Sequence, residues 1–269
     1  WQKGVVTFFE FFDLFIPSLV NWLVPAVIMM WAIPNAKPAP LTEEVELRKG
    51  AYRVIALFIL TIVMAVTAHT VLNLPPVIGM MTGLGLLKLF GYYLRHREST
   101  KLGYLDHEAD AGLAVSERET RREPFNIFRQ IERAEWDTLL FFYGIILCVG
   151  GLGTLGFLAA LSETFYVGFG PTIANILVGL SSSVVDNIPV MYAVLTMLPD
   201  MSHGQWLLAT LTAGVGGSLL SIGSAAGVAV MGQARGVYTF FGHLKWSWAI
   251  GLGFAASIWT HFLINAALF

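Results

Sequence analysis

Apolar residues run in long blocks along this chain, and most blocks are longer than a soluble helix needs. The blocks cover residues 8–33, 51–72, 77–94, 137–161, 173–198, 205–231 and 246–268. A helix needs about 20 apolar residues to cross a hydrocarbon layer of about 30 Å. The pattern therefore predicts an all-α, polytopic membrane protein.

Composition supports this prediction. Of the 269 residues, 56% are apolar and 13% are charged, and the mean hydropathy is +0.68. Soluble domains carry about a quarter charged residues. The single cysteine, Cys148, excludes an internal disulfide and a thiolate metal cluster. The chain starts at Trp1 and shows no signal-peptide pattern, so we expect it to be part of a longer protein.

One apolar block, residues 173–198, contains a polar segment. Its members are Ser181, Ser182, Ser183, Asp186, Asn187 and Pro189. A carboxylate at bilayer depth costs at least about 2.5 kcal/mol, so such a residue usually has a function. Proline tends to break a helix, and the carbonyls that a break frees are oxygen ligands, which hard cations prefer. We predict an alkali-cation site here; alternatively Asp186 caps a short helix, and both can hold together.

Basic residues predict the orientation of the spans. Arg and Lys gather in residues 34–53 and 95–133, which the positive-inside rule assigns to the cytoplasm. If residues 173–198 crossed fully, Arg235 and Lys245 would lie outside, whereas a re-entrant hairpin leaves them inside. A second interruption, between Gly214 and Gly227, predicts a broken helix.

A short sequence occurs twice in the chain. Lys3-Gly4-Val5-Val6-Thr7-Phe8-Phe9 matches Arg235-Gly236-Val237-Tyr238-Thr239-Phe240-Phe241, and an apolar block follows each copy. On the predicted topology the two copies begin on opposite sides of the membrane. This indicates an inverted repeat, an architecture in which secondary transporters bind substrate near the midplane.

Other features have simpler interpretations. His69 and Lys88 lie near the ends of spans, where snorkelling explains them. His243 and His261 invite a pH-sensing role, although anchoring or core packing is commoner. Glycines in residues 149–153 suggest close helix packing. Residues 125–133 have apolar side chains at helical spacing, which suits a surface amphipathic helix or, equally, a soluble cap helix.

The polar segments resemble the NhaD-type sodium/proton antiporters of the ion transporter superfamily. The segments that carry the resemblance are SSVVDNIP (182–189), SIGSAAGVA (221–229), GQARG (232–236) and EWDTLLFF (135–142). The resemblance covers nearly the whole chain and is most specific between Glu135 and Lys245.

The resemblance implies two inverted repeats, each with a re-entrant hairpin whose tip meets an unwound helix. It also implies a homodimer formed by a scaffold domain, and a transport domain that moves like an elevator. The implied regions are 1–34, the last helix of the first repeat; 35–94, scaffold-type helices; 95–136, a cytoplasmic loop with the amphipathic linker helix; 137–245, the transport portion with hairpins and broken helix; and 246–269, a terminal helix.

The resemblance also implies the site. The hairpin tip would consist of Ser182, Ser183, Asp186 and Asn187, and the unwound segment facing it of Gly223, Ser224 and Ala225. Na⁺ would bind at Asp186, Asn187 and Ser183. A carboxylate shielded from water can hold a proton near physiological pH, and Na⁺ bound to it displaces that proton. Asp186 would therefore carry the exchanged proton.

The implied function is exchange of Na⁺ or Li⁺ for H⁺ by a secondary transporter of the bacterial inner membrane. We expect no enzymatic activity, no cofactor and no nucleic-acid partner. An arsenite or di- or tricarboxylate carrier of the same superfamily is the alternative, but the related dicarboxylate carriers have Ser-Asn-Thr where this chain has Val185-Asp186-Asn187. A channel or membrane hydrolase is disfavoured, because the sequence shows no filter, HExxH motif or nucleotide loop.

Overall fold

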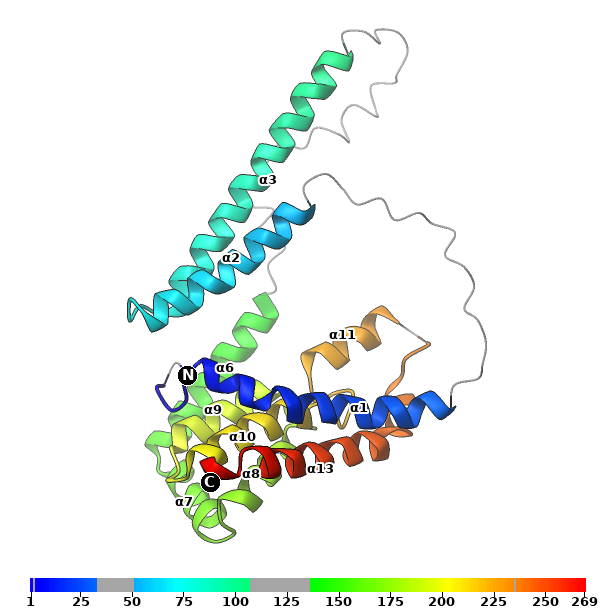
Figure 1. Cartoon of the computed structure of the whole chain (residues 1–269). Coiled ribbons are helices and arrows are strands. Elements are labelled where there is room, and N and C mark those ends of the chain that lie inside the picture. Colours follow the sequence, from blue (N-terminus) through cyan, green and yellow to red (C-terminus); the bar gives the residue numbers. More distant parts are fainter. Residues whose placement is uncertain (2, 33–50, 107–135, 235) are drawn as a thin grey trace. The chain divides into compact units, whose positions relative to one another are not determined.

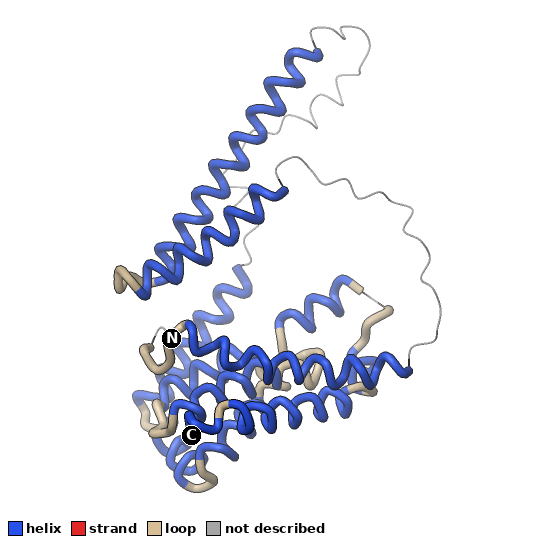
Figure 2. The backbone as a smooth tube through the Cα atoms, viewed as in Figure 1, coloured by secondary structure: helices blue, strands red, loops and turns tan. Residues whose placement is uncertain are grey.

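A computed structural model describes residues 1, 3–32, 51–106, 136–234 and 236–269. Within these ranges the secondary structure is helical and no strand occurs, which confirms the all-α prediction (Figure 2). The predicted linker helix at 125–133 lies outside the described residues. The elements in chain order are the 3-10 helix η1 (Phe9–Leu14), α1 (Phe15–Ala32), α2 (Ala51–Thr70), α3 (Pro76–Asp106), α6 (Trp136–Thr154), α7 (Phe157–Ser162), the π-helix η2 (Glu163–Val167), α8 (Pro171–Ser181), α9 (Asn187–Met197), α10 (His203–Gly216), α11 (Ala225–Gln233), α12 (Phe240–Leu244), α13 (Ser247–Ile264) and the 3-10 helix η3 (Ala266–Leu268) (Figure 1).

Several helices are long and apolar enough to cross a membrane. They are Phe9–Ala32, Ala51–Thr70, Pro76–Leu94 and Ser247–Ile264, with a fifth candidate in the bent pair Leu139–Thr154 and Phe157–Val167. Large apolar side chains such as Trp22, Phe58 and Trp259 are more than half exposed on them. Exposed apolar surface of this extent suits contact with lipid. The chain is an integral, multi-pass membrane protein.

The apolar block 137–161 is not one straight span. The chain bends by 83° after α6, and Gly156 at the bend has a φ of +82°, which glycine adopts at little cost. The sequence also predicted that the glycines of residues 149–153 pack closely against another helix. For Gly150 and Gly151 this prediction is wrong among the described residues. A Cβ on either would meet no atom within 4 Å.

The chain divides into two compact units, which we describe separately. One contains α2 and α3, which pack closely along each other. A Cβ on Gly79 of α3 would lie 2.5 Å from the Cα of Ala65 of α2. Small residues of this kind let membrane helices approach closely. Helix α3 continues past Leu94 to Asp106, so the backbone stays helical beyond the predicted end of this span.

The other unit contains α1 and α6–α13, and α10 is its central helix. It contacts α1, α8, α9 and α13, and its residues Leu207, Leu208 and Ala209 have no exposed surface. Helices α1 and α13 lie side by side and antiparallel (Figure 1). The α10 side chains therefore form the centre of the apolar core against which the polar segments pack.

The two copies of the repeated sequence have similar local structure. Gly4 has a φ of +74° and Gly236 one of +81°, and each is followed by a short helix and then a long apolar one. Asn21 and Gly253 each lie 18 residues after the first residue of their copy, and a Cβ on Gly253 would lie 2.6 Å from the Asn21 carbonyl oxygen. Contact between equivalent positions of antiparallel helices suits a two-fold axis between them. It supports the inverted repeat, which stays a prediction.

Candidate ion-binding site

The polar segment of residues 173–198 joins two short helices. Helices α8 and α9 have 11 residues each, so each spans about 16 Å, roughly half of the hydrocarbon layer. Gly170 (φ +80°) and Pro171 start α8, because proline suits the first helical position. Pro189 lies in the first turn of α9, where its missing N–H costs no helical hydrogen bond. It therefore marks the start of α9 and does not break it.

The glycine-rich segment of residues 205–231 is a broken helix, as predicted. Helix α10 ends at Gly216 and α11 begins at Ala225, and we call residues 217–224 the break. The Ser224 hydroxyl caps α11 by accepting a hydrogen bond of 3.1 Å from the Gly227 N–H. Ala225 was predicted to belong to the unwound segment, and this is wrong. It is the first residue of α11, because the cap lies one position earlier.

The hairpin tip, residues 182–187, meets both α10 and the break. The Ser182 hydroxyl donates a hydrogen bond of 2.7 Å to the Ala213 carbonyl of α10. A Cβ on Gly223 would collide with the Ser183 carbonyl oxygen and lie 2.8 Å from the Gly217 carbonyl oxygen. Only glycine allows these main chains to approach so closely. The structure therefore brings three of the predicted residues, Ser182, Ser183 and Gly223, into one junction.

Asp186 and Asn187 lie at the start of α9 and are partly buried. The Asp186 carboxylate accepts a hydrogen bond of 3.0 Å from the Asn187 N–H, so it caps the helix as the alternative interpretation held. The described residues offer it no cationic partner within ion-pair distance. A capping carboxylate keeps most of its lone pairs, so the same oxygens can still bind a cation or a proton.

The tip serines have hydroxyl groups suited to a cation. The Ser183 hydroxyl donates to the Leu180 carbonyl at 2.7 Å, and the Ser182 hydroxyl donates to Ala213 as described above. A hydroxyl that has given its proton to a carbonyl presents oxygen lone pairs. Both side chains are buried, with exposed fractions of 9% and 0%. Each can therefore contribute an oxygen ligand without exposing it to water.

Ser221, in the break, is a site residue that the sequence prediction missed. Its residue is 2% exposed, and its hydroxyl has no hydrogen-bond partner among the described residues. The main-chain carbonyls of Ser221, Ile222 and Gly223 also accept no hydrogen bond from the described parts of the chain. A buried hydroxyl in this state suggests a bound ion or water. A hydroxyl within the glycine-rich interruption was the available signal.

A buried polar network joins α8 to α10 and was also missed. Asn175, with no exposed surface, donates to the Gln205 carbonyl at 2.9 Å and accepts from the Tyr166 hydroxyl at 3.2 Å. Gln205 donates to the Thr172 hydroxyl at 2.7 Å, and Thr212 donates to the Asn175 carbonyl at 2.8 Å. Single polar residues on apolar helices gave no sign of which partners would satisfy them. Because its members bond one another, we assign the network a structural role.

His261 is a core residue, which agrees with the packing interpretation. Its Nε2 lies 3.0 Å from the Gly204 carbonyl, and its Nδ1 lies 2.9 Å from the Asn265 amide nitrogen. That amide also donates to the Asp13 carbonyl at 3.1 Å, so it faces two acceptors. Nδ1 therefore accepts and Nε2 carries the proton, which is the neutral imidazole.

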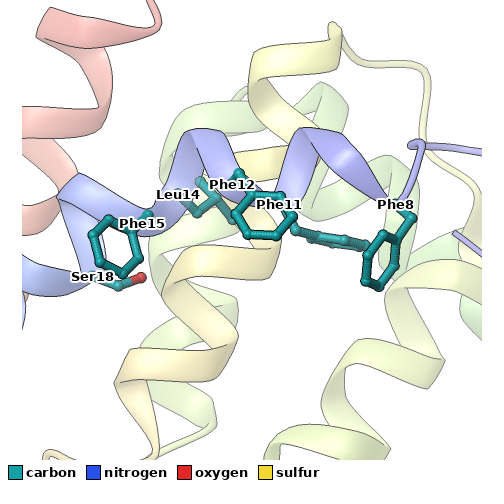
Figure 3. A pocket seen from close by; sticks show the side chains of 6 residues that line it. All are labelled: Phe8, Phe11, Phe12, Leu14, Phe15 and Ser18. Atoms are coloured by element: carbon teal, nitrogen blue, oxygen red, sulfur yellow. The ribbon is translucent and has the colours of Figure 1, made fainter. Parts of the chain in front are cut away.

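Two pockets in the described part of the chain are lined mainly by apolar side chains. One of about 310 Å³ lies at the start of α1 and is lined by Phe8, Phe11, Phe12, Leu14, Phe15 and Ser18 (Figure 3). The other, of about 200 Å³, is lined mainly by apolar side chains of α8, α9 and Leu161–Tyr166. Apolar walls cannot replace the hydration shell of a cation. Neither pocket is therefore a candidate ion site.

The sequence also matches a known protein family. Residues 2–214 match the family model described as citrate transporter. The chain belongs to this family. No solved structure matches it significantly.

Among curated proteins, this family member is similar to the Na⁺/H⁺ antiporter NhaD of Alkalimonas amylolytica, at 56% identity over 278 residues that cover 100% of this chain and 56% of the relative. It is also 56% identical to NhaD of Halomonas elongata over 271 residues, which cover 100% of this chain and 55% of that protein. Sodium/proton antiporter 1 of Arabidopsis thaliana is 29% identical over 263 residues, or 94% of this chain and 42% of the relative. The predicted resemblance is confirmed, and the chain spans about half the length of its bacterial relatives.

Proposed function

We propose that the protein containing this chain is a secondary transporter that exchanges Na⁺ for H⁺. The observation that carries the proposal is the close contact between Ser183 and Gly223. Ser183 lies three residues before the titratable Asp186. The junction offers hydroxyls and main-chain carbonyls, and Asp186 adds a carboxylate in the same hairpin tip; these are the ligand types that hard cations prefer. The names of the similar bacterial and plant proteins support the same two transported ions, Na⁺ and H⁺.

In the proposed site, Na⁺ and H⁺ compete for Asp186. Neutral ligands would come from Ser182, Ser183, Asn187, Ser221 and Ser224. Na⁺ bound to the carboxylate favours its charged form and expels the proton, whereas a proton removes the charge that holds Na⁺. If the carrier reorients with either ion bound, the two ions move in opposite directions.

The architecture that goes with this function is also part of the proposal. Helices α8 and α9 form a re-entrant hairpin, and α1 and α13 belong to oppositely oriented repeats. The transport portion moves in an elevator-like manner within a homodimer of the bacterial inner membrane, with the helix predicted at residues 125–133 as the linker. Li⁺ is the alternative substrate, since it is also a hard alkali cation that oxygen ligands bind.

An anion carrier is the second candidate, because the matching family model is described as citrate transporter. An anion site needs positive charge or many donors. The hydroxyls of the tip serines Ser182 and Ser183 give their protons to main-chain carbonyls, and Asp186 adds negative charge. The junction therefore suits a cation better than citrate.

The test uses the full-length protein in inverted vesicles with a preformed pH gradient. We expect Na⁺ or Li⁺ to collapse the gradient, and Asp186→Asn to abolish the effect, because asparagine keeps the helix cap but cannot exchange a proton. Asp200→Asn, an exposed carboxylate between α9 and α10, is the matched control and should behave as native protein. Uptake of citrate with no cation response at any pH would replace exchange by the anion-carrier function.

A further inference from the structure

Two groups of main-chain carbonyls in the break differ in their hydrogen-bond partners. Those of Ser218 and Leu219, at its start, are bonded by side chains from the α12–α13 segment. The His243 Nε2 lies 3.0 Å from the Ser218 carbonyl, and the Ser247 hydroxyl donates to the Leu219 carbonyl at 2.7 Å. Those of Ser221, Ile222 and Gly223 accept no hydrogen bond from the described residues. The first group is thus held by the protein, and the second is available to a ligand.

One residue of the second group lies next to the hairpin tip. Gly223 lies against the Ser183 carbonyl, and Ser224 begins the cap of α11. A freed carbonyl at membrane depth must find a partner. If the Ser218 and Leu219 carbonyls lost theirs, they would turn toward other partners and carry the rest of the break with them.

Tyr238 sets the tautomer of His243 that the contact with the Ser218 carbonyl requires. Its hydroxyl lies 2.7 Å from the His243 Nδ1, and the two rings stand edge to face with centroids 5.8 Å apart. Burial raises the pKa of the Tyr238 phenol, so the hydroxyl stays a donor. When Nδ1 accepts from it, the ring proton lies on Nε2, where a carbonyl acceptor requires it.

We infer that His243 and Ser247 are positioning residues of the ion site, which hold the Ser218 and Leu219 carbonyls and thereby keep Gly223 of the break against the hairpin tip. The inference rests on the proposed function. It assigns a role to the segment after Arg235, for which the sequence indicated a repeated motif and, at His243, a pH-sensing or anchoring histidine. His243 acts here as a hydrogen-bond donor to the main chain, and not through a change of charge.

The first test is the apparent KM for Na⁺ of the full-length protein in inverted vesicles. We expect His243→Ala and Ser247→Ala each to raise KM about tenfold, the effect of one lost hydrogen bond, with a smaller change in maximal rate. His243→Gln should stay close to native because its amide can donate from a similar position. Leu244→Ala, exposed on α12, and Thr260→Ala, whose hydroxyl bonds within α13, are controls that should leave KM unchanged.

The second test is hydrogen exchange of the same purified proteins, which does not depend on transport. Peptides covering residues 217–224 should exchange faster in His243→Ala and Ser247→Ala, and those covering α8 should not change. If His243→Ala gives no folded protein, Tyr238→Phe replaces it, since it removes only the hydroxyl that sets the tautomer.

The positioning role is overturned if hydrogen exchange in the break is the same in the variants as in native protein. It is also overturned if KM is unchanged and His243→Ala and His243→Gln lose the same amount of maximal rate. If native protein shows no response to Na⁺, the proposed function fails instead. The exchange data then decide by themselves whether these two side chains hold the break.

Discussion

The Ser182 hydroxyl donates its proton to the Ala213 carbonyl, and this hydrogen bond of 2.7 Å joins the hairpin tip to α10. Ser182 has no exposed surface. The contact holds the tip serines beside the break and leaves the hydroxyl lone pairs for an ion. One buried side chain thus links the stability of the junction to its chemistry.

Substitution of Ser182 should therefore affect both properties. We expect Ser182→Ala to lower the free energy of unfolding by about 1–3 kcal/mol, because the buried Ala213 carbonyl loses its donor. It should also raise the apparent KM for Na⁺. Thermal unfolding of the purified protein and transport in vesicles measure the two effects. Ser181→Ala is the control, since Ser181 is exposed and bonds only within its own helix; an equal effect of both substitutions would contradict a special role for Ser182.

The two functions of Asp186 should separate in two substitutions. Asparagine caps a helix as well as aspartate does, so Asp186→Asn should keep the native unfolding free energy and lose proton exchange. Asp186→Ala should lose both, with a destabilisation of about 1 kcal/mol. Thermal unfolding compares the stabilities. If Asp186→Asn exchanges ions at the native rate, Asp186 is only a cap.

Glycine is required where α8 crosses α10. A Cβ on Gly179 would lie 2.6 Å from the Thr212 Cβ, and a Cβ on Gly216 would collide with the Gly179 carbonyl oxygen. We expect Gly179→Ala and Gly216→Ala each to cost about 1–3 kcal/mol or more through overpacking. Gly150→Ala should be neutral or stabilising, because its Cβ would meet nothing within 4 Å and alanine favours the helix. Melting temperatures of the three proteins provide the comparison, and a similar loss in all three would contradict the crossing geometry.

His261 should matter for stability and not for the pH response. His261→Phe leaves the Gly204 carbonyl and the Asn265 amide without this partner, so we expect a loss of about 1–3 kcal/mol. The pH profile of transport should keep its midpoint, because the histidine is neutral and acts through both ring nitrogens. Transport measured between about pH 5 and 8, the range in which a histidine titrates, checks this. A shifted midpoint would restore the pH-sensing hypothesis.

The sequence by itself determined that this protein lies in a membrane and where along the chain its polar junction is found. The lengths of the apolar blocks follow from the thickness of the hydrocarbon layer, so they predict the spans without knowledge of packing. A serine-rich tip with Asp186 and a glycine-rich break stand out for a related reason, since polar and broken segments are costly in lipid. Their helix boundaries were less predictable, as Ala225 and the bend at Gly156 show, because caps and left-handed turns depend on local geometry.

Only the tertiary structure decided which groups meet. Ser182 with Ala213, Asn175 with Gln205, and His243 with Ser218 are pairs separated by 25 residues or more along the chain. Such pairs leave no periodic signal, because the partner of a buried polar group is set by how the helices pack and not by spacing. The same packing decided that the Ser218 and Leu219 carbonyls of the break meet His243 and Ser247.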